Sequence, residues 1–77
     1  MRSKYKSTKI RPCIDLKRCD VCGSVPILVL NMFIDRLGAY VHCSNDCHVT
    51  AMRHCGKDEG VVLVDEVKSD WNKRRFL

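Results

Sequence analysis

Apolar residues gather in the central part of the chain and predict a β-hairpin there. The segment from Pro26 to Ile34 is rich in β-branched and aromatic residues, a composition typical of a strand. Residues 35–38 supply a turn in which Gly38 is free to adopt a positive φ. Residues 39–43 predict a second short strand, which pairs with the first across this turn.

The pattern becomes helical toward the C-terminus. Val64, Val67 and Trp71 recur at positions i, i+3 and i+7, which lie on one face of a helix. We therefore predict a helix from Asp65 onward, while residues 61–64 either extend a strand or begin this helix. Acidic residues near its start and basic residues near its end suit the helix dipole. Trp71 is expected to bury its ring in the core against the hairpin.

Weaker signals mark the remaining segments. Residues 1–12 are polar and lack periodicity, which predicts a basic flexible arm ahead of a single domain at 13–77. Residues 13–18 predict a short turn or an edge strand, residues 48–54 are compatible with a third strand, and residues 56–60 predict a loop. The whole pattern predicts a small α+β domain with a hairpin and one C-terminal helix.

The short length of the chain indicates that it needs a source of stability beyond its hydrophobic core. A chain of 77 residues holds one domain with a small core, and such domains often need a metal ion, disulfides or a partner. Six cysteines are present, and the charged N-terminus has no apolar run typical of a signal peptide or a membrane span. We therefore expect a cytosolic protein whose thiols bind metal rather than oxidise.

The spacing of the cysteines predicts one closed zinc site. Cys19-x2-Cys22 and Cys43-x3-Cys47 form two pairs on either side of the predicted hairpin. Each pair can grip an ion from a tight turn, and Gly23 provides the backbone freedom that the first turn needs. The hairpin brings the two turns together, and four thiolates complete a tetrahedron. The chain is thus expected to form a zinc-ribbon-like domain, with two cysteine knuckles around a hairpin and one structural Zn²⁺.

Other potential ligands leave alternatives open. Cys13, Cys55 or a histidine can replace one of the four cysteines, and Cys47 is the ligand most open to replacement, by His48 or Cys55. Neighbours in sequence rarely bind one ion together, so the histidines that adjoin cysteines are expected to be packing or surface groups. Cys13 and Cys55 otherwise act as small, half-buried apolar residues.

The same residues carry a resemblance to a known family. The motifs concerned are Cys19-Asp20-Val21-Cys22-Gly23, Pro26 to Leu30, Tyr40-Val41-His42-Cys43-Ser44-Asn45-Asp46-Cys47 and Trp71-Asn72-Lys73-Arg74. Over residues 16–75 the chain resembles the Lar-like restriction alleviation proteins of phages and prophages. The resemblance implies the four cysteine ligands, a helix marked by Trp71-Asn72, and no catalytic residues. It also implies modulation of a host enzyme, a type I restriction–modification enzyme, by protein–protein interaction in the bacterial cytosol.

The charge distribution is compatible with a second function, the binding of nucleic acid. The net charge is +5, and basic residues concentrate at both ends of the chain. They are Arg2, Lys4, Lys6, Lys9, Arg11, Lys73, Arg74 and Arg75. Either these ends contact phosphates or they are solvated tails that aid solubility. The scattered aromatic residues argue against a surface that stacks single-stranded bases.

An enzymatic function is not expected. A thioredoxin-like Cys-x-x-Cys site needs a βαβ unit, which a chain of this length cannot supply. A hydrolytic zinc needs an open coordination position and a general base. Asp20 and Asp46 lie within the knuckles, where the usual role of an acid is to form the turn.

Overall fold

The computed structural model describes residues 5–77 and contains four strands followed by one α-helix. The elements are β1 (Tyr5–Pro12), β2 (Pro26–Phe33), β3 (Leu37–Cys43), β4 (Arg53–Cys55), the 3-10 turn η1 (Lys57–Glu59) and α1 (Gly60–Asn72). Arg2 and Lys4 of the predicted arm lie outside the described residues, as does the side chain of Lys6.

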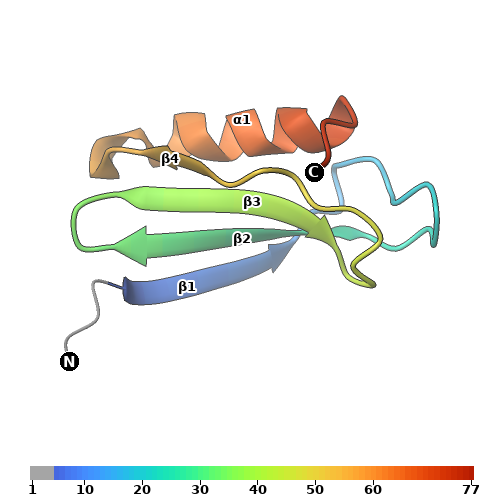
Figure 1. Cartoon of the computed structure of the whole chain (residues 1–77), viewed down its shortest axis with the longest axis horizontal. Coiled ribbons are helices and arrows are strands. Elements are labelled where there is room, and N and C mark those ends of the chain that lie inside the picture. Colours follow the sequence, from blue (N-terminus) through green and yellow to red (C-terminus); the bar gives the residue numbers. More distant parts are fainter. Residues whose placement is uncertain (1–4) are drawn as a thin grey trace.

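The strands form one antiparallel sheet in the order β1-β2-β3-β4. The helix α1 lies on one face of this sheet, mainly against β3 and β4 (Figure 1). Two packed layers of this kind allow a short chain to enclose a single core. The prediction of a small α+β, zinc-ribbon-like fold with a hairpin and a C-terminal helix is confirmed.

The central hairpin forms as predicted, although its second strand begins earlier. β3 starts at Leu37 because the turn closes within three residues, with the Phe33 N–H donating to the Arg36 carbonyl at 2.9 Å. The positive φ expected at Gly38 is wrong, since this residue lies inside the strand. A Cβ on Gly38 would come within 3.1 Å of the His54 ring. The glycine therefore permits a close approach between β3 and the start of β4.

The N-terminal segment differs most from its prediction. Residues 5–12 are not a flexible arm, because β1 pairs with β2 along its length, with Lys9 opposite Leu30 and Arg11 opposite Leu28. An edge strand is held by backbone hydrogen bonds and needs no alternation of apolar residues. A polar edge strand such as β1 therefore lacks the pattern from which strands are predicted. Charged side chains and a terminal proline are typical of edge strands, where they discourage pairing with other chains.

The segment after β3 forms less strand than residues 48–54 suggested. Val49 and Thr50 make isolated bridges to His42 and Phe76, and the strand β4 begins only at Arg53. Thr50 is buried, and its hydroxyl accepts a hydrogen bond from the Val41 N–H at 3.0 Å. The predicted loop at 56–60 contains the turn η1, which runs directly into α1.

The helix is one turn longer than predicted and presents a slightly different face to the core. It begins at Gly60, and its fully buried apolar residues are Leu63, Val67 and Trp71. These positions follow an i, i+4, i+8 spacing, so they lie on one side of the helix. Val64 flanks this face and is half-buried. The core also contains Cys13, Leu16, Cys19, Leu28, Ala39, Val41 and Cys43.

The end of the helix grips the segment that leads to the first cysteine pair. The Trp71 indole N–H donates to the Lys17 carbonyl at 2.7 Å, and the Lys17 N–H donates to the Asn72 side-chain oxygen at 3.0 Å. The backbone N–H and carbonyl of Lys17 are thus both hydrogen-bonded, by two side chains adjacent in the sequence. The predicted core role of Trp71 is confirmed, because its ring is fully buried.

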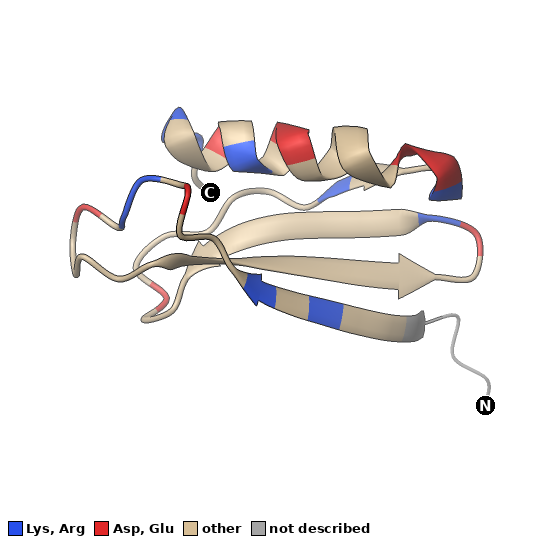
Figure 2. Cartoon of the chain, turned by 180° about the vertical axis from the view of Figure 1, so that it is seen from behind, with Lys and Arg blue, Asp and Glu red and all other residues tan. Residues whose placement is uncertain are grey.

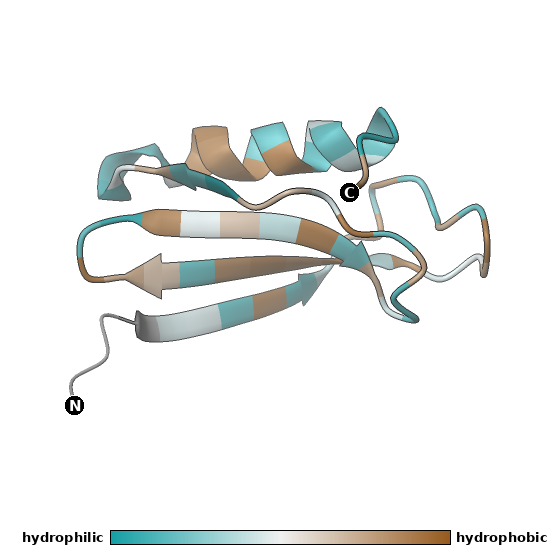
Figure 3. Ribbon diagram, in the orientation of Figure 1, coloured by the Kyte–Doolittle hydropathy of each residue, from teal (hydrophilic) through white to brown (hydrophobic). Residues whose placement is uncertain are grey.

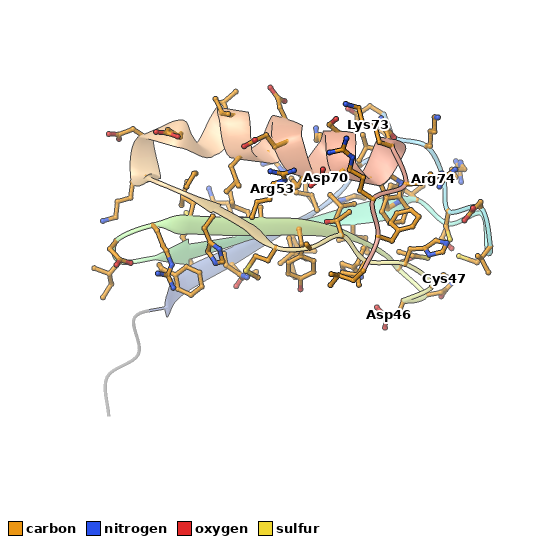
Figure 4. All side chains as sticks on the ribbon, turned by 45° about the horizontal axis from the view of Figure 1, so that its top comes forward. Asp46, Cys47, Arg53, Asp70, Lys73 and Arg74 are labelled. Carbon is orange, nitrogen blue, oxygen red and sulfur yellow. The ribbon has the colours of Figure 1, made fainter. Side chains whose placement is uncertain are left out.

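A second contact joins the helix to β4. Arg53 donates two hydrogen bonds to Asp70, at 2.6 and 3.1 Å, and its third nitrogen lies 3.5 Å from Glu66 (Figure 4). The hydrogen bond from Arg53 lowers the pKa of Asp70, which is itself buried. This forked geometry favours the ionised carboxylate and fixes the short strand β4 beside α1.

We predict that Arg53→Met lowers the urea midpoint of the metal-loaded protein, because Asp70 would remain buried without its partner. A double-mutant cycle with Asp70→Asn should recover part of this loss. Because the pKa of Asp70 lies below its ordinary value, the carboxylate is ionised in both folded and unfolded chains between about pH 6 and pH 8. The loss should therefore be constant across this range. If the double variant lost as much stability as the two single variants together, Arg53 and Asp70 would not be coupled.

Candidate metal centre

The two cysteine pairs meet at one end of the sheet. Cys19 and Cys22 lie in the loop between β1 and β2, whereas Cys43 ends β3 and Cys47 follows in the next turn (Figure 1). The register of the hairpin places Pro26, the first residue of β2, opposite Cys43. The loop before β2 and the turn after β3 are therefore neighbours because the strands are antiparallel.

The four sulfur atoms form a compact group. All lie within 4.8 Å of one another, and the sulfurs of Cys22 and Cys43 are 3.2 Å apart. A tetrahedral ion with Zn–S bonds of about 2.3 Å requires sulfur separations of about 3.8 Å, so an ion would widen the 3.2 Å separation of Cys22 and Cys43. The predicted set of Cys19, Cys22, Cys43 and Cys47 is thus brought together so that it can hold a metal ion.

Backbone amides shape the first knuckle. The Gly23 N–H donates to the Cys19 carbonyl at 2.8 Å, and the Val21 N–H points at the Cys19 sulfur at 3.4 Å. Gly23 adopts a φ of 72°, in the region where a side chain would be strained. The role predicted for Gly23 is confirmed, and the amide aimed at the sulfur favours a thiolate there.

The second knuckle has three residues between its cysteines where the first has two. As in the first knuckle, one backbone amide points at the sulfur of the first cysteine and another donates to its carbonyl. The Asn45 N–H points at the Cys43 sulfur at 3.3 Å, and the Asp46 N–H donates to the Cys43 carbonyl at 2.9 Å. Asp46 takes up the extra residue with a φ of 58°, a conformation that aspartate tolerates better than most residues. The Asn45 side-chain amide donates to the Ser24 hydroxyl at 3.1 Å and so links the two knuckles.

The four thiols differ in exposure and in pKa. Cys19 and Cys43 are buried, Cys47 is half-buried and Cys22 is exposed. Hydrogen bonds, first from Ser24 and then from Asn45, lower the pKa of Cys22 to about 5. Burial, together with hydrogen bonds from neighbouring thiols, raises the pKa of Cys47 to about 12. Four thiolates at this spacing repel one another, so their full ionisation requires a cation among them.

The two remaining cysteines lie outside this group. The Cys13 thiol is buried and lies 3.8 Å from the Arg11 carbonyl, while the Cys55 thiol lies 3.1 Å from the Gly56 carbonyl. Burial raises the pKa of both thiols, which favours their neutral form. Cys13 packs in the core, as expected of a small apolar residue, and the structure brings neither thiol to the cluster.

One histidine stands beside the metal centre. The His48 Nε2 lies 2.9 Å from the Asp20 carboxylate, and these two side chains fall within 4.8 Å of the Cys19 sulfur. The hydrogen bond to His48 lowers the pKa of Asp20. His48 also stacks on Phe76 at 4.2 Å between ring centroids. Asp20 therefore contacts His48 in addition to forming part of the turn. The residues around Asp20 in the sequence do not predict this contact.

The other histidines are engaged elsewhere. His42 Nδ1 lies 2.8 Å from its neighbour's carbonyl at Cys43 and 3.3 Å from Asp46. The ring of His54 lies 6.5 Å from that of Phe33. Of the alternative ligands considered from the sequence, the structure places only His48 next to the cluster within residues 5–77.

The fold and this cluster define a zinc-ribbon-like α+β domain with four cysteines that could hold a metal ion. No family model, curated protein or solved structure matches the chain. The similarity to Lar-like proteins therefore stays a prediction that rests on the motif residues. Across residues 5–77, no helix has the length and apolar character needed to cross a membrane.

We predict that Cys43→Ser weakens metal binding by more than about 100-fold, because outer-shell changes alone cost 10- to 100-fold. Cys55→Ser is the matched control and should retain one ion per chain, since Cys55 lies outside the cluster. His48→Gln should also retain the ion. Native mass spectrometry measures the metal content of all three variants. An ion that survives Cys43→Ser, or is lost in Cys55→Ser, would contradict the assigned ligand set.

Proposed function

We propose that the four cysteines bind one structural Zn²⁺ and that the protein acts through its surface. Four cysteine sulfurs within 4.8 Å of one another are a ligand set that zinc favours, and four thiolates would fill its coordination sphere. A filled sphere leaves no position for substrate or a catalytic water, which supports a binding protein over an enzyme. In this proposal the ion stabilises the fold, and the surface around it carries the function.

We predict that removal of the ion by a chelator unfolds the chain. Ligation in small zinc modules contributes on the order of 10 kcal/mol, more than a core of this size can replace. Circular dichroism should show loss of the sheet on chelation and recovery when Zn²⁺ is added. Cobalt substitution should give the visible absorption of tetrahedral thiolate ligation. A metal-free chain that keeps its sheet, with or without disulfides, would overturn the structural role of the ion.

The partner we propose is a host enzyme, with type I restriction–modification enzymes as the specific candidates. The support is the resemblance to Lar-like proteins, in which the knuckle Cys19-Asp20-Val21-Cys22-Gly23 and the ending Trp71-Asn72-Lys73-Arg74 are the distinctive motifs. The contacts of Trp71 and Asn72 with Lys17 give this motif a structural role, because they hold the end of α1 to the segment before the first knuckle. The proposed setting is the cytosol of a bacterial host during phage or prophage expression.

We predict that the metal-loaded protein binds a purified type I restriction–modification enzyme and reduces its cleavage of unmodified DNA. Biolayer interferometry and a cleavage assay measure the two effects separately. Cys55→Ser serves as the folded control and should behave as the wild type. Absence of binding by the zinc-loaded, folded protein would reject this partner, whatever the metal experiments show.

Nucleic acid is the second candidate partner. Lys9 and Arg11 are exposed on β1 and form no ion pair with any described residue. Lys73, Arg74 and Arg75 are also exposed and lie beyond the end of α1. Binding to phosphates would fall steeply as salt rises, whereas a packed protein interface would change much less. Fluorescence anisotropy with labelled DNA at several salt concentrations distinguishes the two functions.

A further inference from the structure

The helix lies over only half of its sheet face, and residues 12–15 border the other half. α1 lies over β3 and β4, while the same face of β2 and β1 borders a cavity of about 410 Å³. Strands are spaced by about 4.8 Å and a helix is about 10 Å wide, so one helix covers roughly two strands. A four-stranded sheet therefore has room for a second helix beside α1, and residues 5–77 provide none.

This uncovered region is a groove with an apolar floor and a basic rim, which we call the basic groove. The buried Leu28 and the half-buried Leu30 form its floor, Val64 of α1 lines one side, and Ile14, which is 84% exposed, also lines it. Lys9 and Arg11 lie directly opposite Leu30 and Leu28 in the β1–β2 register, so they share this face of the sheet. Neither of these two cations has an ionic partner among the described residues.

The groove's chemistry specifies what would fill it. Its floor requires an apolar stripe, and its free cations require acidic side chains beside that stripe. Lys68, on the α1 side of the groove, is already paired with Asp15 at 3.6 Å, so the unmatched positive charge lies on β1. An acidic amphipathic helix meets both requirements.

The outer side of α1 carries such a pattern. Val61, Val62 and Asp65 lie in the first turns of α1, and Asp58 lies in η1 directly before it; we call these four residues the valine strip. All four are exposed, with Val61 at 78% and Val62 at 56%. Figure 3 shows the apolar colouring of β2 and of the N-terminal half of α1. Figure 2 shows acidic residues along η1 and α1 and basic residues on β1.

We propose that two copies of the chain form a symmetric dimer in which the valine strip of each copy occupies the basic groove of the other. The arrangement places the two helices side by side between two sheets. A two-fold axis repeats every contact, so one complementary pair of surfaces supplies both halves of the interface. Asp58 and Asp65 have no ion pair within the described part of the chain, and they would meet Lys9 and Arg11 of the second copy.

A charge-swap experiment tests this dimer in the metal-loaded protein. Lys9→Glu with Arg11→Glu reverses the groove, and Asp58→Lys with Asp65→Lys reverses the strip. Each double variant should weaken dimerisation by more than about tenfold, because like charges would face each other at both contacts. Mixing the two double variants should restore the dimer, since both contacts in the heterodimer then join opposite charges. Lys73→Glu with Arg75→Glu is the matched control, because it changes charge outside the groove.

Sedimentation equilibrium from micromolar to near-millimolar concentration measures the association, and circular dichroism checks that each variant is folded. A concentration-dependent dimer that each swap weakens, and that the mixture restores, supports the proposal. A wild-type protein that stays monomeric, or a dimer that survives both swaps, would overturn it. A monomer that binds DNA through Lys9 and Arg11 would also overturn it and assign the groove to phosphates.

Discussion

Cys22 and Cys43 are separated by twenty residues in the chain, yet their sulfurs lie 3.2 Å apart, and the rest of the structure is arranged to keep them there. The antiparallel register of β2 and β3 brings the two knuckles to one end of the sheet. Amides at Val21 and Asn45 then point at the sulfurs and favour their ionised form. Closing the cluster therefore depends on the hairpin, and the small hairpin gains stability from the cluster.

The helix reinforces this end of the molecule from the opposite side. Trp71 and Asn72 hold the backbone of Lys17, two residues before Cys19, so the position of the first knuckle is tied to the end of α1. The Trp71 ring also meets Phe76 edge to face, with centroids 5.1 Å apart. Core packing and the position of the first cysteine pair are thus coupled through one short segment.

The sequence allowed prediction of those parts whose signals are local. The cysteine pairs, the hairpin and the apolar face of the helix each follow from spacing or composition within a short window. The strand β1 could not be predicted, because an edge strand is fixed by backbone pairing that leaves little trace in its side chains. The contact between Asp20 and His48 joins residues 28 positions apart and has no local signal. The position of Gly38 inside a strand likewise reflects a tertiary approach by His54.

A metal ion in the cluster would help to stabilise a domain whose single helix lies over only part of its sheet. Leu28 is already buried in the core and Leu30 is half-buried, so a second helix over them would add only part of the missing stability. In the proposed zinc-bound protein, ligation at one end would supply part of that free energy, while the groove at β1 and β2 stays open. In the proposed function, an ion held by the four cysteines would maintain the fold, and the sheet face beside α1 would remain available for association.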